Sequence, residues 1–185
     1  MPRIPLLWLL SVLILCALTA CSFSNHKDEP ASSSITVTAG GSNIPAMIQI
    51  ITEGHTANTS GEAPFRAILE DSKVSIPYVK LGESVQIQLE KGAPAVYELS
   101  DVLLSENGGY KYRMPEDKPI VMEFSSGSGS FVLKENMAAF LSSNTKDYEP
   151  GATIRGFKLT KQGGGEKQEY YFVLRTDAGS VSQRL

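Results

Sequence analysis

A histidine beside a serine could support acyl transfer, because a hydrolase of that kind needs a nucleophile, a base and an orienting carboxylate. The chain has two histidines, His26 and His55. His55 lies in the polar stretch Thr52–Glu62, and no serine occupies the G-x-S-x-G pattern that exposes a nucleophile at a strand-to-helix turn. We therefore expect His55 to be an exposed loop residue, and an envelope hydrolase that uses it is the alternative.

Neighbouring acids could carry out glycoside hydrolysis, which uses two carboxyl groups as acid and base. The acid pairs of this chain are Glu70–Asp71, Glu116–Asp117 and Asp147/Glu149. Each pair lies beside turn-forming residues or at the end of an apolar run, where solvated carboxylates are typical. The sequence favours none of the three, so a hydrolase that uses one of them stays open as an alternative.

Metal and phosphate sites have sequence patterns that this chain does not contain. It has no D-x-D-x-D-G loop, no H-E-x-x-H pair, no Cys–His zinc spacing and no Gly-rich phosphate loop. We therefore predict no cofactor and assign no metal ligand, with a weak calcium site formed by loop carboxylates as the alternative.

A β-sandwich that binds sugars normally presents exposed aromatic side chains. Tyr110 and Tyr112 are two residues apart after the turn Glu106–Gly109, which predicts that they share one face of a short strand. Half-buried strand aromatics are the favoured interpretation, and we assign no carbohydrate site to them.

Both cysteines lie near the N-terminus, at positions 16 and 21. Arg3 is followed by the apolar segment Ile4–Leu18, which Thr19–Cys21 closes. A positive start, an apolar middle and a small-residue end are the three parts of a secretory signal. An uncleaved membrane helix is the alternative, because the 17 residues of Ile4–Ala20 reach the lower limit for crossing a bilayer.

The end of this segment resembles the lipobox of bacterial lipoproteins, in which a large aliphatic residue and two small residues precede an invariant cysteine. Leu18 is too large for an ordinary A-x-A cleavage site, whereas Leu18, Thr19, Ala20 and Cys21 match the lipobox in order and in type. The resemblance implies that the sulfur of Cys21 receives a diacylglycerol, that the chain is cut between Ala20 and Cys21, and that the new amino group accepts a fatty acid such as palmitate. The rest of the chain would then have no free thiol.

The lipobox resemblance also implies a location and a set of partners. Two or three acyl chains hold a protein stably at a membrane, whereas one holds it only marginally. We therefore expect attachment to the extracytoplasmic face of the cell membrane, or to the outer membrane of a two-membrane envelope, with an envelope protein or cell-wall component as a further partner. Without Arg3, 16 Lys and Arg residues face 20 Asp and Glu residues. This acidic balance argues against a nucleic-acid partner.

Three parts follow along the chain: residues 1–20 as the signal peptide, 21–34 as the lipidated cysteine with a flexible tether, and 35–185 as a single β-sandwich domain. Residues 22–34 are rich in Ser and charged residues and have no apolar period. His26 lies among them and is expected to be solvated. As a flexible coil this tether would hold the domain roughly 20 Å from the bilayer.

Alternation of apolar and polar residues predicts strands throughout the remainder. The clearest case is Ser84–Glu90, in which Val85, Ile87 and Leu89 share one face. Tyr171 and Val173 lie opposite Tyr170, Phe172 and Leu174, which predicts a strand buried on both faces. The other predicted strands are Ile35–Thr38, Met47–Thr52, Phe65–Leu69, Ala95–Leu104, Tyr110–Arg113, Ile120–Phe124, Ser130–Lys134, Thr153–Lys161 and Glu169–Thr176.

Glycine-rich turns suggest how these strands connect. Ser125–Gly129 predicts a hairpin between its flanking strands, and Gln162–Glu166 predicts another at the C-terminal end. Ile154 is out of phase with Phe157 and Leu159, which predicts a bulge at Gly156. Only Lys134–Ser143 looks helical, because Met137, Phe140 and Leu141 fall at positions i, i+3 and i+4.

Many short strands with one short helix predict an all-β fold, an antiparallel immunoglobulin-like β-sandwich, with a barrel as the alternative. The stretch from Gly151–Phe157 to Tyr171–Val173 resembles the closing hairpin of small immunoglobulin-like surface proteins. Together these patterns predict a non-enzymatic, lipid-anchored binding or accessory module whose loops contact a ligand that the sequence does not identify. The alternatives are the envelope hydrolase and a structural component of the envelope.

Overall fold

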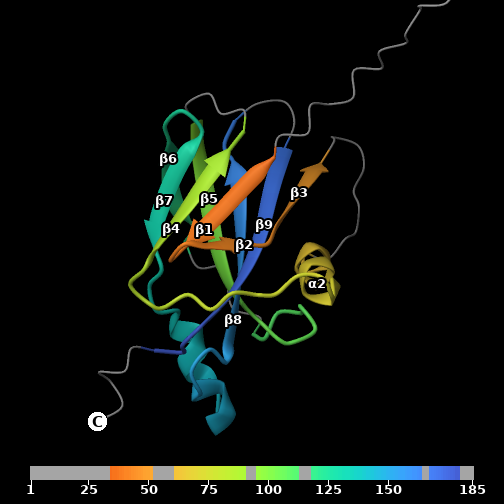
Figure 1. Ribbon diagram of the computed structural model, residues 1–185, viewed down its shortest axis with the longest axis vertical. Helices are drawn as coiled ribbons and strands as arrows, with labels where there is room; N and C mark the ends of the chain where they lie inside the picture. The colour runs from red at the N-terminus through yellow and green to blue at the C-terminus, as the bar shows by residue number, and fades with distance from the viewer. Residues whose placement is uncertain (1–33, 52–60, 91–94, 113–117, 164–166, 180–185) are drawn as a thin grey trace, which may run out of the picture. The chain divides into compact units, whose positions relative to one another are not determined.

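Two antiparallel β-sheets face each other in the computed structural model (Figure 1), which describes residues 34–51, 61–90, 95–112, 118–163 and 167–179. One sheet has four strands in the order β2-β1-β4-β7, and the other has five in the order β3-β9-β8-β5-β6. The all-β sandwich is confirmed, and its immunoglobulin-like type stays a prediction. The strand bounds are β1 Ile35–Ala39, β2 Ser42–Ile44, β3 Ala46–Ile51, β4 Ser84–Leu89, β5 Ala95–Leu104, β6 Ile120–Phe124, β7 Ser128–Val132, β8 Thr153–Lys161 and β9 Lys167–Thr176.

The main core lies between the two sheets and follows the predicted alternation. Val85, Ile87 and Leu89 of β4 are buried, while the residues between them face solvent. From the five-stranded sheet, the rings of Phe157 and Phe172 stack with centroids 5.0 Å apart. Burying apolar side chains of this size contributes about 1.5–3 kcal/mol each, so this core dominates the stability of the fold.

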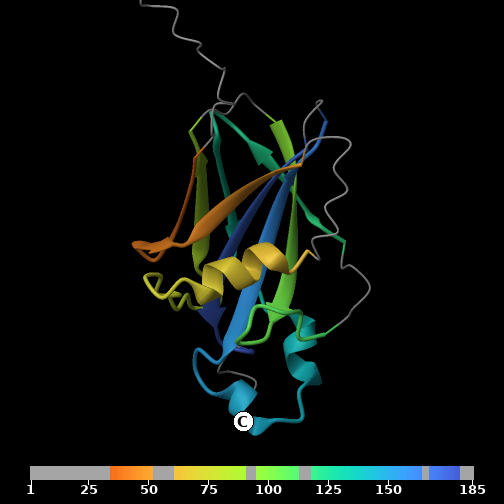
Figure 2. The same cartoon turned by 90° about the vertical axis from the view of Figure 1, so that its right-hand side faces the viewer.

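The prediction of a strand at Phe65–Leu69 is wrong, because these residues belong to the α-helix α2, Ala63–Glu70. Pro64 lies in the first turn, where a helix tolerates the missing N–H. Phe65 and Ile68 are buried on one side of the helix. Figure 2 shows α2 lying across the outer face of the five-stranded sheet, where it contacts β9 and β3.

A second core fills the space between α2 and this sheet. Phe65 and Ile68 of the helix meet Ile154, Tyr171 and Val173 of the sheet. Strand β9 is therefore buried on both faces, as predicted. The side chain of Ile154 is buried on this outer face, whereas the side chains of Phe157 and Leu159 in the same strand point into the main core.

The predicted bulge at Gly156 is wrong. Strand β8 pairs with β5 and β9 in unbroken registers through this residue. A Cβ on Gly156 would lie 2.8 Å from both Leu104 Cδ1 and Phe65 Cε1. Gly156 is thus the place where the sheet makes room for the ring of Phe65.

The turn between β6 and β7 forms, but the predicted hairpin is wrong. Ser125 and Ser128 exchange backbone hydrogen bonds of 3.0 and 2.9 Å, and Ser126 and Gly127 both have positive φ. Yet β6 pairs with β5 and β7 pairs with β4. The tight turn therefore carries the chain from one sheet to the other.

The expected helix at Lys134–Ser143 is a short 3₁₀-helix, η1, Met137–Leu141, followed by η2, Thr145–Tyr148. The side chains expected on its apolar face are exposed, Met137 at 74% and Leu141 at 56%. Ala138 and Ala139 are buried instead, against Leu103 and Ala178. Small side chains let this segment approach the end of the sheet closely.

Of the remaining expectations, some are confirmed and others are not. The C-terminal hairpin of β8 and β9 is confirmed, and β2 follows a turn at Gly40 and Gly41 that the sequence analysis did not use. Of Tyr110–Arg113, Tyr110 forms one isolated bridge with Leu104, and Arg113 lies outside the described residues. No helix within the described ranges is long and apolar enough to cross a membrane.

Candidate functional site

Several residues singled out from the sequence lie outside the described part of the chain. These are the lipobox residues Leu18, Thr19, Ala20 and Cys21, both histidines (His26 and His55), and the acid pair Glu116–Asp117. The lipid site, and hydrolases that would use His55 or that acid pair, therefore stay predictions. Two acid pairs and the two tyrosines can be placed.

The pair Glu70–Asp71 lies at the C-terminal end of α2. Asp71 has extended backbone angles and ends the helix, and its Oδ1 accepts a hydrogen bond of 3.0 Å from the backbone N–H of Lys73. This contact is the ordinary way in which an aspartate stabilises a turn. Asp71 thus has a structural role at this position.

Asp147 lies in η2 and forms the most elaborate polar contact among the predicted site residues. Its Oδ2 lies 2.6 Å from Nζ of Lys111 and also accepts a hydrogen bond from the hydroxyl of Ser142. The hydroxyl of Tyr148 donates to the backbone oxygen of Ser142 at 2.7 Å. These bonds join η1, η2 and the segment after β5. Glu149, the other acid of the pair, ends η2 through its backbone N–H.

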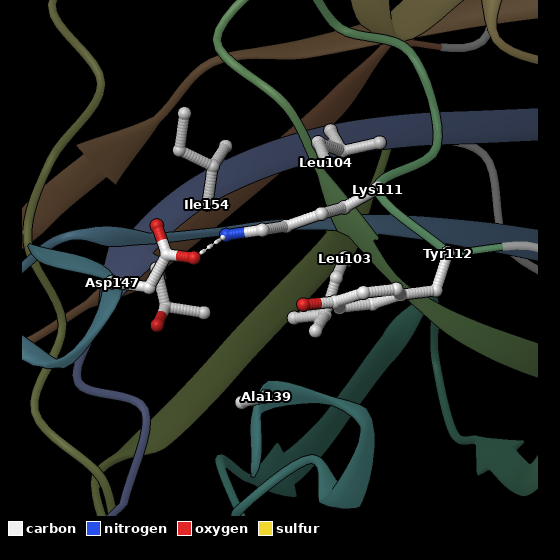
Figure 3. Close-up of a pocket in the computed structure, with 8 residues that line it drawn as sticks. Leu103, Leu104, Lys111, Tyr112, Ala139, Asp147 and Ile154 are labelled. Carbon is white, nitrogen blue, oxygen red and sulfur yellow. Dashed lines mark ion pairs between the residues drawn. The ribbon is translucent and has the colours of Figure 1, made fainter. Parts of the chain in front are cut away.

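A small hollow lies beside the Lys111–Asp147 ion pair (Figure 3). Its apolar lining includes Leu103, Ala139 and Ile154, and Tyr112 closes one side. The hollow has a volume of about 10 Å³, which is room for about one water molecule. A drug-sized ligand needs several hundred Å³ of cleft, so this hollow suits an ordered water.

The charge state of Asp147 follows from its contacts. Hydrogen bonds from Lys111 and then from Ser142 lower the pKa of its carboxyl below the ordinary value, and partial burial opposes them weakly. A general acid needs a raised pKa to keep its proton near neutral pH. Asp147 is instead held ionised as an acceptor, which suits a clasp between two segments.

Tyr110 and Tyr112 do not form a shared aromatic surface. The ring of Tyr110 packs edge-on against Phe65 of α2 with centroids 6.3 Å apart. Tyr112 packs against the cluster formed by Leu103, Ala138 and Ala139. Tyr112 is therefore half-buried, as expected, whereas Tyr110 is 36% exposed although its ring packs against Phe65.

A buried ion pair that no short-range sequence pattern predicts lies at the end of the main core. Arg155 of β8 is 3% exposed, and its guanidinium holds both oxygens of Asp101 on the neighbouring strand β5. The same guanidinium lies 5.3 Å from the ring centroid of Phe157. A buried charge needs hydrogen-bonded partners of opposite charge, and the guanidinium of Arg155 donates hydrogen bonds to the carboxylate of Asp101.

No group of three or more His, Cys, Asp or Glu side chains is placed to hold a metal ion within the described ranges. Asp71 thus stabilises a turn, Asp147 joins two segments and Asp101 pairs with a buried arginine. A scan against models of known protein families finds no match, and a search of curated protein sequences finds none.

Proposed function

We propose that this chain is a lipid-anchored bacterial protein that acts on the extracytoplasmic face of a membrane as a non-enzymatic binding or accessory module. The observation that carries the proposal is the order Leu18-Thr19-Ala20-Cys21 at the end of an apolar segment. In this proposal Cys21 carries the acyl chains and becomes the first residue of the mature protein.

The architecture after the tether supports a displayed module. Strand β1 begins at Ile35, directly after the Ser-rich stretch that we interpret as the tether. Acyl chains fix the location, roughly 20 Å of flexible chain sets the reach, and the sandwich presents its surfaces to a partner in the envelope. Asp71, Asp101 and Asp147 have structural contacts, which favours a structural role over catalysis for these three residues.

The test is the chemistry at Cys21. Intact-protein mass spectrometry of the native chain should find a mature N-terminus at Cys21 with added acyl mass. Growth with an alkyne fatty acid should label the wild-type chain, and Cys21→Ala should lose both the label and membrane association. Cys16→Ala is the matched control and should keep both, because Cys16 leaves with the signal peptide.

An intact Met1 or an unmodified thiol at Cys21 would overturn the lipid anchor. Labelling that survives Cys21→Ala would overturn it too, because the acyl chain would then be attached elsewhere.

A further inference from the structure

The outer face of the five-stranded sheet carries an alternating arrangement of valine and glutamate at one corner. In β5 and β6, Val96 pairs with Glu123 and Glu98 pairs with Val121. All four side chains point away from the main core, since Tyr97, Leu99, Met122 and Phe124 between them are buried in it. Val121 is 66% exposed and Val96 is 42% exposed. Two apolar and two acidic side chains thus share one surface, which we call the Val/Glu corner.

This corner lies on an edge strand with little protection. Strand β6 is the outermost strand of its sheet, so one row of its backbone N–H and C=O groups has no partner strand. Proteins usually protect such an edge with proline, lysine or a bulge. Lys118 and Pro119 protect the edge directly before β6, but Ile120–Phe124 itself contains neither residue type, and it pairs with β5 without a break in register. The edge therefore has the backbone geometry that accepts a further strand.

The two carboxylates at the corner lack a cationic partner. Among the described residues, neither Glu98 nor Glu123 forms an ion pair. The Val/Glu corner therefore presents two carboxylates without an ion pair beside exposed apolar surface. A partner that brings a basic side chain next to Glu123 and an apolar one next to Val121 would pair the carboxylate and cover the exposed apolar surface.

We propose that the edge of β6 binds an extended segment of a partner protein that presents, on the face shared with the Val/Glu corner, a basic side chain and, two residues away, an apolar one. The added strand would extend the five-stranded sheet, with main-chain hydrogen bonds supplying affinity and the alternating side chains supplying specificity. Strands in a sheet lie about 4.8 Å apart, which places a lysine or arginine of the partner beside Glu123. This inference rests on the binding role proposed above and names its partner.

A second copy of this chain fits the edge less well. In an antiparallel pair of two β6 strands centred on Val121, Glu123 would lie opposite Pro119 of the other copy. Centring the pair on Met122 would place Glu123 opposite Val121. Neither register brings a basic residue of β6 to the carboxylate, because Ile120–Phe124 contains none. The charge pattern thus favours a different partner.

The test uses the full-length chain in neutral detergent micelles and three fluorescent seven-residue peptides. In the valine–lysine peptide, lysine and valine take turns at every second position with threonine between them, so that one face presents both types. The valine–glutamate peptide has glutamate in place of each lysine, and the third is the valine–lysine peptide with alternate amides N-methylated. Fluorescence anisotropy should show that the valine–lysine peptide binds more tightly than both others. Hydrogen exchange of the β6 amides should slow when it binds.

Charge reversal at the corner then tests the site. Glu123→Lys should weaken the valine–lysine peptide about five-fold, because an attractive cross-strand pair becomes a repulsive one, and should strengthen the valine–glutamate peptide. The matched control Glu149→Lys reverses an exposed acid in a different part of the fold and should change neither. Circular dichroism checks that each variant is folded.

Four outcomes would overturn the proposal. They are the absence of binding by the valine–lysine peptide, equal affinity of the N-methylated peptide, the same peptide preference in Glu123→Lys as in the wild type, and a dimer that protects β6 without any peptide. None of them depends on the mass of Cys21, so failure of this proposal is distinguishable from failure of the lipid anchor.

Discussion

The two halves of one sheet face differ in how they are covered. Beneath α2, the outer face of β9 and β8 presents Ile154, Tyr171 and Val173, all buried. Across the same face, β5 and β6 present the Val/Glu corner, where the side chain of Val121 is mostly exposed. The part beneath α2 is apolar at Ile154, Tyr171 and Val173, and the open part alternates between valine and glutamate.

This difference suggests that the half beneath α2 serves the stability of the fold and that the open half is available for binding. The covered half cannot lose α2 without exposing aromatic and branched side chains, so its residues should be sensitive to substitution. Within the described residues α2 contacts β9 and β3, and Val121 of the open half is mostly exposed, so its residues should tolerate substitution and be available to another molecule. The predictions below test that separation, in order of expected effect.

Among the variants that should still fold, Phe65→Ala should have the largest effect. The ring of Phe65 is 1% exposed and packs edge-on against Tyr171 with centroids 5.2 Å apart. Replacing a buried phenylalanine by alanine lowers the free energy of unfolding by about 3–5 kcal/mol. Urea unfolding followed by tyrosine fluorescence measures it, and a loss below about 1 kcal/mol would mean that α2 is not part of the core.

Gly156→Ala should have a smaller but clear effect beneath the same helix. Its new methyl group would meet Leu104 and Phe65 at 2.8 Å, and overpacking of this kind lowers stability by about 1–3 kcal/mol. Adding Phe65→Leu should recover part of that loss, because leucine lacks the ring atom that clashes. Strictly additive losses in the double variant would show that the two positions do not compete for space.

The ion pair between Asp147 and Lys111 should contribute less to the free energy of unfolding than the packing of α2 on the sheet. Asp147→Asn removes the ion pair with Lys111, and we expect it to lower the free energy of unfolding by about 1 kcal/mol at neutral pH. Glu149→Gln is the control, because its side chain is exposed and its contact to η2 is made by the backbone. Thermal unfolding of both variants beside the wild type measures the difference.

The effect of Asp147 should also depend on pH with a defined sign. Its pKa is lowered in the folded protein, so its contribution is present above the ordinary carboxyl pKa of 3.8 and is lost as the pH falls through the lower folded value. Wild type and Asp147→Asn should therefore converge in acid. A difference that persists unchanged below pH 3 would contradict the clasp.

Short-range pattern was enough to predict much of the sandwich. The bounds of β5 and β8 and the alternation of β4 follow directly from the sequence. Helix α2 was missed although Phe65, Ile68 and Leu69 fall at helical spacing, because a short apolar run also suits a strand. What decides between the two is the sheet surface on which the segment packs.

Features that need long-range pairing could not be predicted. Asp101 and Arg155 are 54 residues apart and meet only through the register of β5 with β8. The Val/Glu corner likewise requires the register of β5 with β6, and the sheet to which β6 belongs is not encoded in the turn that follows it. Local composition therefore defines the strands, while pairing defines the candidate surfaces.

Val121→Lys should have the smallest effect on stability, and it separates the two halves most directly. An exposed edge position accepts lysine readily, so the free energy of unfolding should change by no more than about 0.5 kcal/mol. Val173→Lys is the matched substitution in the covered half, where the side chain is fully buried, and it should prevent folding because an unpaired charge would be buried. A loss above about 1 kcal/mol in Val121→Lys, measured by urea unfolding, would show that the corner is already covered in the isolated protein. Near-neutral behaviour at Val121 beside failure at Val173 would show that only the half beneath α2 is needed for folding, because the same chemical change would be tolerated on the other half.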